Sequence, residues 1–158
     1  MGKIITFVMN NKIVLMAIWF DDYNIEYFNM SAKDTILEHL DIRFEEIGDN
    51  YLVASMPVDH RTCQPFRLLH GGASVTLAES LGSMASWAIL DPNKFYPVGL
   101  EVNANHVRSV TSGRVSGKAK AIHIGRKTHI WGIDIVSEEG KLVCTSRLTI
   151  AVLNKKDQ

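Results

Sequence analysis

No stretch of this 158-residue sequence is apolar over the roughly 18 residues that a membrane-spanning helix requires. Two apolar runs near the N-terminus, 4–9 and 13–20, are short, and no small-residue cleavage site follows them. We therefore expect neither a membrane partner nor a secretory signal peptide. An excess of one charge is missing too, because 17 Lys and Arg residues balance 17 Asp and Glu residues. The charge balance thus gives no indication of a nucleic-acid partner.

Cysteine is scarce, with Cys63 and Cys144 as the only two. Their spacing matches no metal-ligand pattern, so we expect no metal site, and such usage is typical of the reducing cytoplasm. Internal repeats and low-complexity linkers are also missing. A chain of this length with 46% hydrophobic residues can bury the core of one domain. We predict a single domain over residues 16–158, preceded by an N-terminal extension of residues 1–15, with Met16 as the usual start.

The stretch 69–89 carries the most information about function. Its apolar residues fall on nearly every side of a helical period, which is typical of a helix buried on all sides. Gly71 and Gly72 open this expected helix, and the Asp-Pro-Asn sequence at 91–93 ends it. Glu79 is its single charge, and the neighbouring positions one turn away are mostly small or polar. The carboxylate therefore has room beside it.

Burying a charge in such a helix costs free energy, so we expect the Glu79 carboxylate to have a specific partner or a function. In one interpretation a backbone amide or an arginine satisfies the carboxylate. In the other, Glu79 acts with the free N–H groups at Gly71 and with His70, which stands just before the glycines. A carboxylate, a helix N-terminus and an imidazole can attack a carbonyl and hold its oxyanion. Both interpretations stay open on residue pattern alone.

The rest of the chain predicts one short helix and a series of strands. Ser31 followed by Asp34 is typical of a helix start and places a helix at about 32–39. The expected strands are 42–47, 51–58, 97–107, 113–124, 128–137 and 141–153. One face of 97–107 is expected to hold Val98, Leu100, Val102 and Ala104. Strands joined by short turns pair antiparallel, so we predict an α+β fold with a long helix wrapped by a curved antiparallel sheet of five or six strands.

The segment from Gln64 to Met84 resembles the hotdog-fold acyl-CoA thioesterases. It reads Gln-Pro-Phe, then Leu-Leu-His-Gly-Gly-Ala-Ser, then Leu-Ala-Glu-Ser-Leu-Gly-Ser-Met. Further stretches that resemble the family are 56–59, 99–106, 123–126 and 144–148. The resemblance covers about residues 16–153 and is closest to the 1,4-dihydroxy-2-naphthoyl-CoA hydrolases and the related enzymes of phenylacetate-degradation type. It implies the hotdog fold for this chain.

The resemblance also implies a role for each matching residue of the helix. Glu79 would be the catalytic carboxylate, either as nucleophile or as general base on water. The Gly71 N–H would polarise the thioester carbonyl, and His70 and Gln64 would position the reactants. Ser83, one helical turn beyond Glu79, would line the acyl pocket or hold a water, and Met84 would contact substrate. In this family the site lies between two subunits, so Glu79 of one chain would face Gly71 of the other.

Four residues outside the helix are candidates for contact with substrate. His106 either touches substrate or ends a strand, and the sequence favours neither. Gly125 and Arg126 lie at an expected hairpin tip, where exposed charge usually serves only solubility. For a CoA enzyme, Arg126 and Arg108 are also natural ligands of phosphate, and the resemblance supports that use.

These observations predict a cytoplasmic enzyme that hydrolyses acyl-CoA or aroyl-CoA thioesters. Coenzyme A would be part of the substrate, and no separate cofactor is expected. The polar face of strand 97–107, with Asn103 and Asn105, favours edge-to-edge pairing with a second copy, and dimers are expected to pair further into a homotetramer. Two alternatives remain: a hotdog dehydratase or hydratase, and a non-catalytic module that binds CoA thioesters.

Overall fold

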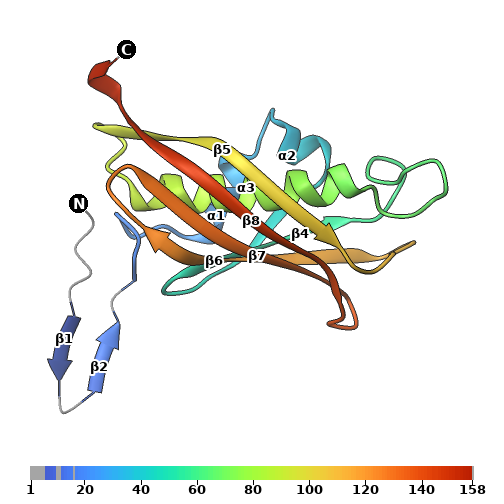
Figure 1. Cartoon of the computed structure of the whole chain (residues 1–158), viewed down its shortest axis with the longest axis horizontal. Helices are drawn as coiled ribbons and strands as arrows, with labels where there is room; N and C mark the ends of the chain where they lie inside the picture. The colour runs from blue at the N-terminus through green and yellow to red at the C-terminus, as the bar shows by residue number, and fades with distance from the viewer. Residues whose placement is uncertain (1–5, 10–11, 16, 158) are drawn as a thin grey trace.

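One long helix, α3 (Gly71–Ile89), lies in the curve of a six-stranded antiparallel sheet (Figure 1). The computed structural model describes residues 6–9, 12–15 and 17–157. The strands of the large sheet are β3 (Arg43–Ile47), β4 (Tyr51–Pro57), β5 (Phe95–His106), β6 (Arg114–Ile124), β7 (Thr128–Ser137) and β8 (Leu142–Asn154). They are ordered β3-β4-β6-β7-β8-β5. The expected α+β arrangement, with a helix wrapped by a curved antiparallel sheet, is confirmed.

The core lies between α3 and the concave face of the sheet. Its fully buried large side chains include Leu77, Leu81, Trp131, Ile135, Leu148 and Ile150. Two glycines allow the close approach of helix and sheet, since a Cβ at Gly117 would lie 2.7 Å from Leu81 Cδ1 and one at Gly82 would collide with Leu148. Among the described residues, no helix combines the length and the apolar character needed to cross a bilayer.

The helix expected at about 32–39 is shorter in the structure, as α2 (Ile36–His39). A second short helix, α1 (Ile25–Ser31), precedes it and was not predicted. Ser31 ends α1 instead of starting α2, so that part of the prediction was wrong. The chain turns at Asp34, whose φ of 59° is left-handed and breaks a continuous helix. Thr35 then caps α2 by accepting the N–H two residues on, at 3.2 Å.

Strand β5 breaks the expected alternation of its faces. A bulge between Gly99 and Glu101 inserts Leu100 as an extra residue relative to β8. Gly99 therefore faces α3, whereas Val98 and Leu100 are 40% and 63% exposed. The prediction that Val98 and Leu100 lie on the same face as Val102 and Ala104 was wrong. β5 is also the last strand of the sheet, so its outer edge has no strand partner among the described residues.

The N-terminal residues form a separate hairpin. β1 (Thr6–Met9) pairs with β2 (Lys12–Leu15) in a two-stranded antiparallel sheet that projects away from the large sheet in Figure 1. The chain joins the main body at Ile18, whose N–H donates to the Asp49 carbonyl at 2.9 Å, and at Phe20, whose N–H donates to the Ala88 carbonyl at 2.8 Å. Met16, the expected start of the domain, lies outside the described residues.

We predict that removal of residues 1–15 leaves the melting temperature within about 3 °C of the full chain, a shift worth about 1 kcal/mol at this size. An isolated two-stranded hairpin contributes little stability, and the anchors at Ile18 and Phe20 are retained. A shorter chain that lacks residues 1–20 is the control, because it loses those anchors and should melt clearly lower. Equal losses for both deletions would show that the hairpin is part of the folded domain.

Candidate active site

The N-terminus of α3 is capped by an imidazole. His70 is the N-cap residue, and its Nδ1 accepts the Gly72 N–H at 2.8 Å, the bond that a Ser or Asp oxygen makes in most caps. Because Nδ1 is the acceptor, the ring proton of neutral His70 lies on Nε2. His70 is exposed, so this N–H is available to a molecule at the helix end.

The two glycines at the helix start make room for two imidazole rings. A Cβ at Gly71 would lie 2.8 Å from His106 Nε2, and one at Gly72 would lie 2.9 Å from His70 Nδ1. No described residue accepts a hydrogen bond from the Gly71 N–H. A free N–H at the positive end of a 19-residue helix is suited to an anion or a polarised carbonyl oxygen. The structure therefore brings His70, Gly71 and His106 together.

A narrow hairpin arm carries Gln64 to the same end of the molecule. Cys63 bridges Leu69, the Gln64 N–H donates to the Leu68 carbonyl at 2.8 Å, and the His70 N–H donates to the Thr62 carbonyl at 2.8 Å. Gln64 Oε1 accepts the N–H two residues on, at 2.9 Å, so its amide nitrogen is the free end of the side chain. Gln64 and His70 are thus held by the two strands of one arm.

An ion pair secures the base of this arm. Arg61 Nη2 lies 2.6 Å from Asp59 Oδ2, and the Arg61 guanidinium lowers the pKa of Asp59 to about 2. Thr62, which is buried, donates its hydroxyl to the Pro57 carbonyl at 2.7 Å. These contacts fix the arm against the end of β4. The position of Gln64 is therefore set by the fold and not by a free loop.

Glu79 lies in the middle of α3 and is half-buried. Ser83, one turn further on, donates its hydroxyl to Glu79 Oε1 at 3.0 Å. On the other side the carboxylate rests against β5, since a Cβ at Gly99 would lie 2.5 Å from Oε1. Among the described residues, no Lys, Arg or His forms an ion pair with Glu79. Met84, the next candidate along the helix, packs against the hydrophobic core.

One chain does not bring Glu79 and Gly71 to the same point. Eight residues of helix separate them, which is about 12 Å along the axis at the rise of an α-helix. A thioester carbonyl within hydrogen-bond reach of the Gly71 N–H is therefore out of reach of the Glu79 carboxylate of the same chain. The expected oxyanion donor and the expected catalytic carboxylate are therefore both present in one chain, but they are too far apart to act on the same thioester.

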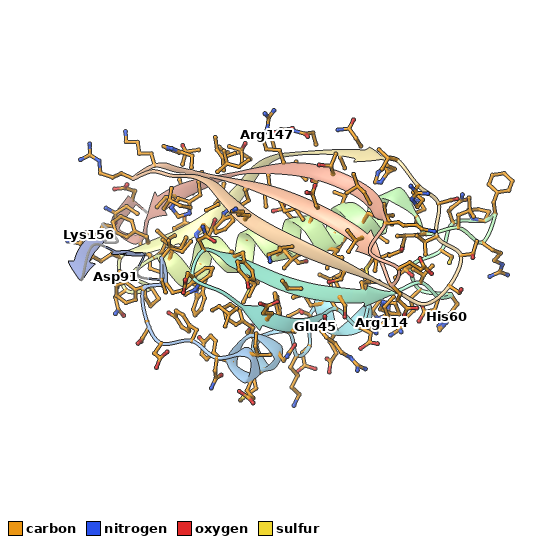
Figure 2. The ribbon with its side chains drawn as sticks, turned by 90° about the horizontal axis from the view of Figure 1, so that it is seen from below. Glu45, His60, Asp91, Arg114, Arg147 and Lys156 are labelled. Carbon is orange, nitrogen blue, oxygen red and sulfur yellow. The ribbon has the colours of Figure 1, made fainter. Side chains whose placement is uncertain are left out.

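The remaining candidates lie at opposite ends of α3. Arg108 Nε donates to the Leu142 carbonyl at 3.2 Å, close to the end of β5 that carries His106. Gly125 and Arg126 instead line a cavity of about 930 Å³ beside the C-terminus of α3. Figure 2 shows His60, on the arm side, and Asp91, which lines this cavity, at the two ends of the molecule. The first and last residues of the 19-residue helix α3 are themselves about 27 Å apart.

Two features of the site were not identified from the sequence. Gly99 lies against Glu79, and the available signal was that a glycine inside a strand pattern often marks a close approach of another group. His129 lines the cavity beside Arg126. Within the described residues, no three His, Cys, Asp or Glu side chains are grouped to hold a metal ion.

Comparison with known proteins gives consistent results. The family model of the thioesterase superfamily matches residues 66–144. The chain is 52% identical over 136 residues to the 1,4-dihydroxy-2-naphthoyl-CoA hydrolase of Escherichia coli, covering 86% of this chain and 99% of that protein. It is 46% identical over 136 residues to the proofreading thioesterase EntH of Cronobacter turicensis, covering 86% and 98%.

A solved structure shares the architecture. The crystal structure of a mutant of thioesterase PA1618 from Pseudomonas aeruginosa aligns with a TM-score of 0.86 and 54% identity, covering 87% of this chain and 99% of that one. The hotdog fold expected from the resemblance is confirmed. These comparisons do not test the role of any single residue, so the assignments to Glu79, His70, Gly71 and Gln64 stay predictions.

Gly99→Ala is expected to reduce the rate of benzoyl-CoA hydrolysis by about 10- to 100-fold, the scale of a catalytic group displaced by an ångström. The added methyl group would push against Glu79 Oε1. Gly132→Ala is a matched control on β7, because a Cβ there would lie 3.1 Å from the exposed Ile122 side chain, which can move. Similar rates for the two variants would show that the contact between Gly99 and Glu79 does not matter for activity.

Proposed function

This chain belongs to the thioesterase superfamily and is a thioester hydrolase, and from this premise we propose that it cleaves acyl-CoA or aroyl-CoA thioesters at a site shared by two subunits. The observation that carries the proposal is that two groups on α3 are available to a substrate. The Gly71 N–H has no described acceptor, and the Glu79 carboxylate has no described cation. One is suited to an oxyanion, the other to attack or to proton removal.

Pairing of two β5 edges would unite these groups. Within one chain Glu79 rests against Gly99, and Gly71 rests against His106. An antiparallel pair of β5 strands centred between Val102 and Asn103 places Gly99 opposite the partner's His106. The partner's Gly71 then lies beside Glu79. The same pairing brings the exposed Val98 next to the partner's Val107, which is also exposed, and buries both.

The reaction then follows from the positions of these groups. The Gly71 N–H polarises the thioester carbonyl and holds the oxyanion as a tetrahedral intermediate forms. As general base, Glu79 takes a proton from water while the water oxygen bonds to the carbonyl carbon. As nucleophile, it forms a mixed anhydride that water then cleaves. In either route the C–S bond breaks, CoA leaves as the thiol with one proton, and the acyl group leaves as the acid.

The other candidate residues fit the two ends of such a substrate. Ser83 lies beside Glu79, and the acyl group would sit there and extend along α3 toward Met84. An aromatic acyl group would match the substrate named for the Escherichia coli relative. His70, His106 and Gln64 would surround the thioester.

The proposed β5 pairing also accounts for the two arginines at opposite ends of one chain. It places the partner's Arg108 at the end of the molecule that carries Arg126, where both side chains can bind the phosphates of CoA. The further pairing of dimers into a homotetramer, the cytoplasmic location and the absence of a cofactor remain part of this proposal.

The two alternatives make different demands on the site. A dehydratase or hydratase needs a base aimed at the carbon next to the carbonyl, whereas His70 Nδ1 is occupied by the helix cap. A non-catalytic binding module would have no use for an unpaired Glu79. Release of free thiol from a panel of acyl-CoA substrates separates hydrolysis from both.

We expect Glu79→Gln to lower kcat by about 10²- to 10⁴-fold with little change in substrate affinity, because the amide keeps the shape but cannot attack or accept a proton. The melting temperature should hold or rise slightly, since a partly buried charge is removed. Steady-state kinetics with benzoyl-CoA measures the effect. A variant within about threefold of the wild-type rate contradicts the catalytic assignment of Glu79.

The Gly71 amide can be removed without breaking the helix. Gly71→Pro deletes the N–H at the first helical position, where proline is favoured, and His70 already has the extended backbone that precedes a proline (φ −70°, ψ 131°). We expect kcat to fall by about 10²- to 10³-fold, as for loss of an oxyanion donor. Gly71→Ala is the matched control, because its Cβ crowds His106 equally but the N–H remains. Equal activity of the two variants would rule out this amide as the oxyanion donor.

The same variants test the shared site. In a dimer of one Glu79→Gln chain and one Gly71→Pro chain, each shared site takes residue 79 from one chain and residue 71 from the other. One site therefore carries both substitutions, and the other site carries neither. We expect the coexpressed pair to regain a substantial part of wild-type activity, although each variant alone is nearly inactive. Recovery no greater than the sum of the separate variants would place both groups in a site formed by one chain.

A further inference from the structure

A buried polar network lies below the turn at Gly125–Lys127 and takes no part in the chemistry above. Ser86 on α3 and His129 and Trp131 on β7 are each at most 1% exposed. Trp131 Nε1 donates to Ser86 Oγ at 2.7 Å, and Ser86 Oγ lies 3.1 Å from His129 Nδ1. A histidine this deeply buried needs all its polar atoms satisfied, so its orientation is closely defined.

The two hydrogen-bond partners of His129 together assign its ring proton to Nε2. Ser86 Oγ accepts the indole proton and can donate its own hydroxyl proton to His129 Nδ1, while the Gly125 backbone is the second partner of the ring. Burial lowers the pKa of His129 to about 4, helped by His123, while a hydrogen bond to the Gly125 backbone acts in the opposite direction. His129 is therefore neutral near pH 7 and has one N–H to donate.

His129 lines the same cavity as Gly125, Arg126 and Lys127, and its ring reaches this turn through the Gly125 backbone. The Gly125 N–H already donates to the Thr128 carbonyl at 2.9 Å, so the Gly125 carbonyl is the group left to accept from His129 Nε2. On the other side, the Lys127 carbonyl accepts the Val152 N–H at 2.9 Å. The backbone on both sides of Arg126 is fixed, while the Arg126 side chain is exposed beside the cavity of about 930 Å³.

We propose that His129 is a positioning residue, which holds the Gly125–Lys127 turn so that Arg126 is presented to the phosphates of the CoA substrate. The inference rests on the proposed function only in naming CoA as the anion. A long flexible arginine binds an anion more tightly when its backbone is already in place, because less conformational freedom is lost on binding. His129 acts through Arg126 and touches no reacting atom.

The test compares two substrates and two replacements. His129→Leu should raise KM for benzoyl-CoA by about three- to tenfold, since part of a charged contact is lost, with kcat changed less than about twofold. KM for benzoyl-pantetheine, which lacks the nucleotide phosphates, should stay unchanged. His129→Gln should recover most of the loss, because its amide can donate to Gly125. In an Arg126→Ala background, His129→Leu should add no further effect.

Controls separate positioning from stability. Ile135→Val lowers the stability of the same strand without touching the network, and it should leave the ratio of the two KM values unchanged. If His129→Leu does not fold, Ser86→Ala is the second variant, because it frees Nδ1 and should shift the same ratio in the same direction. An equal rise of KM for both substrates, or an undiminished effect in the Arg126→Ala background, overturns the proposal.

Direct binding separates this inference from the proposed hydrolysis. Calorimetry of CoA and of pantetheine needs no turnover. If the wild-type protein binds CoA but hydrolyses no thioester, the proposed function fails. A selective loss of CoA affinity in His129→Leu would still support the positioning role. Equal CoA affinity in wild type and variant, or no CoA binding by either, refutes it.

Discussion

The rise per residue of the α-helix keeps the two groups proposed for catalysis apart within one copy of this chain. A catalytic carbonyl must lie within about 3 Å of the amide that holds its oxygen, whereas Gly71 and Glu79 are about 12 Å apart on α3. Neither group can move along a helix that the sheet packs against. If both act on one thioester, they come from two chains. The open edge of β5 and the exposed apolar side chains at Val98 and Leu100 are then parts of the site, because they allow a second copy to approach.

The hydroxyl residues of α3 explain how a buried helix carries polar groups without leaving them unsatisfied. Thr76 donates to the Gly72 carbonyl and Ser80 to the Thr76 carbonyl, so these two return to their own helix. Ser83 instead orients Glu79, and Ser86 bonds to Trp131 and His129 on the sheet. At helical spacing, the latter two lie on one face that leads from the carboxylate toward the cavity. The same helix thus supports both ends of the proposed substrate site.

Much of the fold follows from periodicity in the sequence. The apolar residues on all sides of 71–89 correctly predicted a central helix, and alternation located β5 to β8 to within two residues at each end. The failures have local causes. A left-handed residue at Asp34 delays the start of the expected helix to Ile36, and the bulge after Gly99 moves Val98 and Leu100 to the exposed face. Alternation alone does not reveal a bulge, because one inserted residue reverses the two faces without changing composition.

The candidate site was predictable in its residues but not in its arrangement. The motif around His70 and Glu79 is continuous in sequence, so it was found together with its resemblance to a family. The contacts of His129 depend on long-range packing, since Ser86 is 43 residues away, and no local pattern contains them. The same holds for the placement of Arg108 and Arg126 at opposite ends of one chain, which only the strand order of the sheet reveals.

The two oxygens of Glu79 are not equivalent, and this difference bears on the chemistry. Oε1 accepts the Ser83 hydroxyl at 3.0 Å and lies closer to β5, at 2.5 Å from a Cβ built on Gly99, against 3.5 Å for Oε2. No described residue donates a hydrogen bond to Oε2. Ser83 and β5 therefore fix the orientation of the carboxylate through one oxygen and leave the other free. In the proposed reaction, Oε2 would be the atom that bonds to a carbonyl carbon or takes a proton from water. Because only one oxygen is free, the direction of attack in the proposed reaction would be set before a substrate binds.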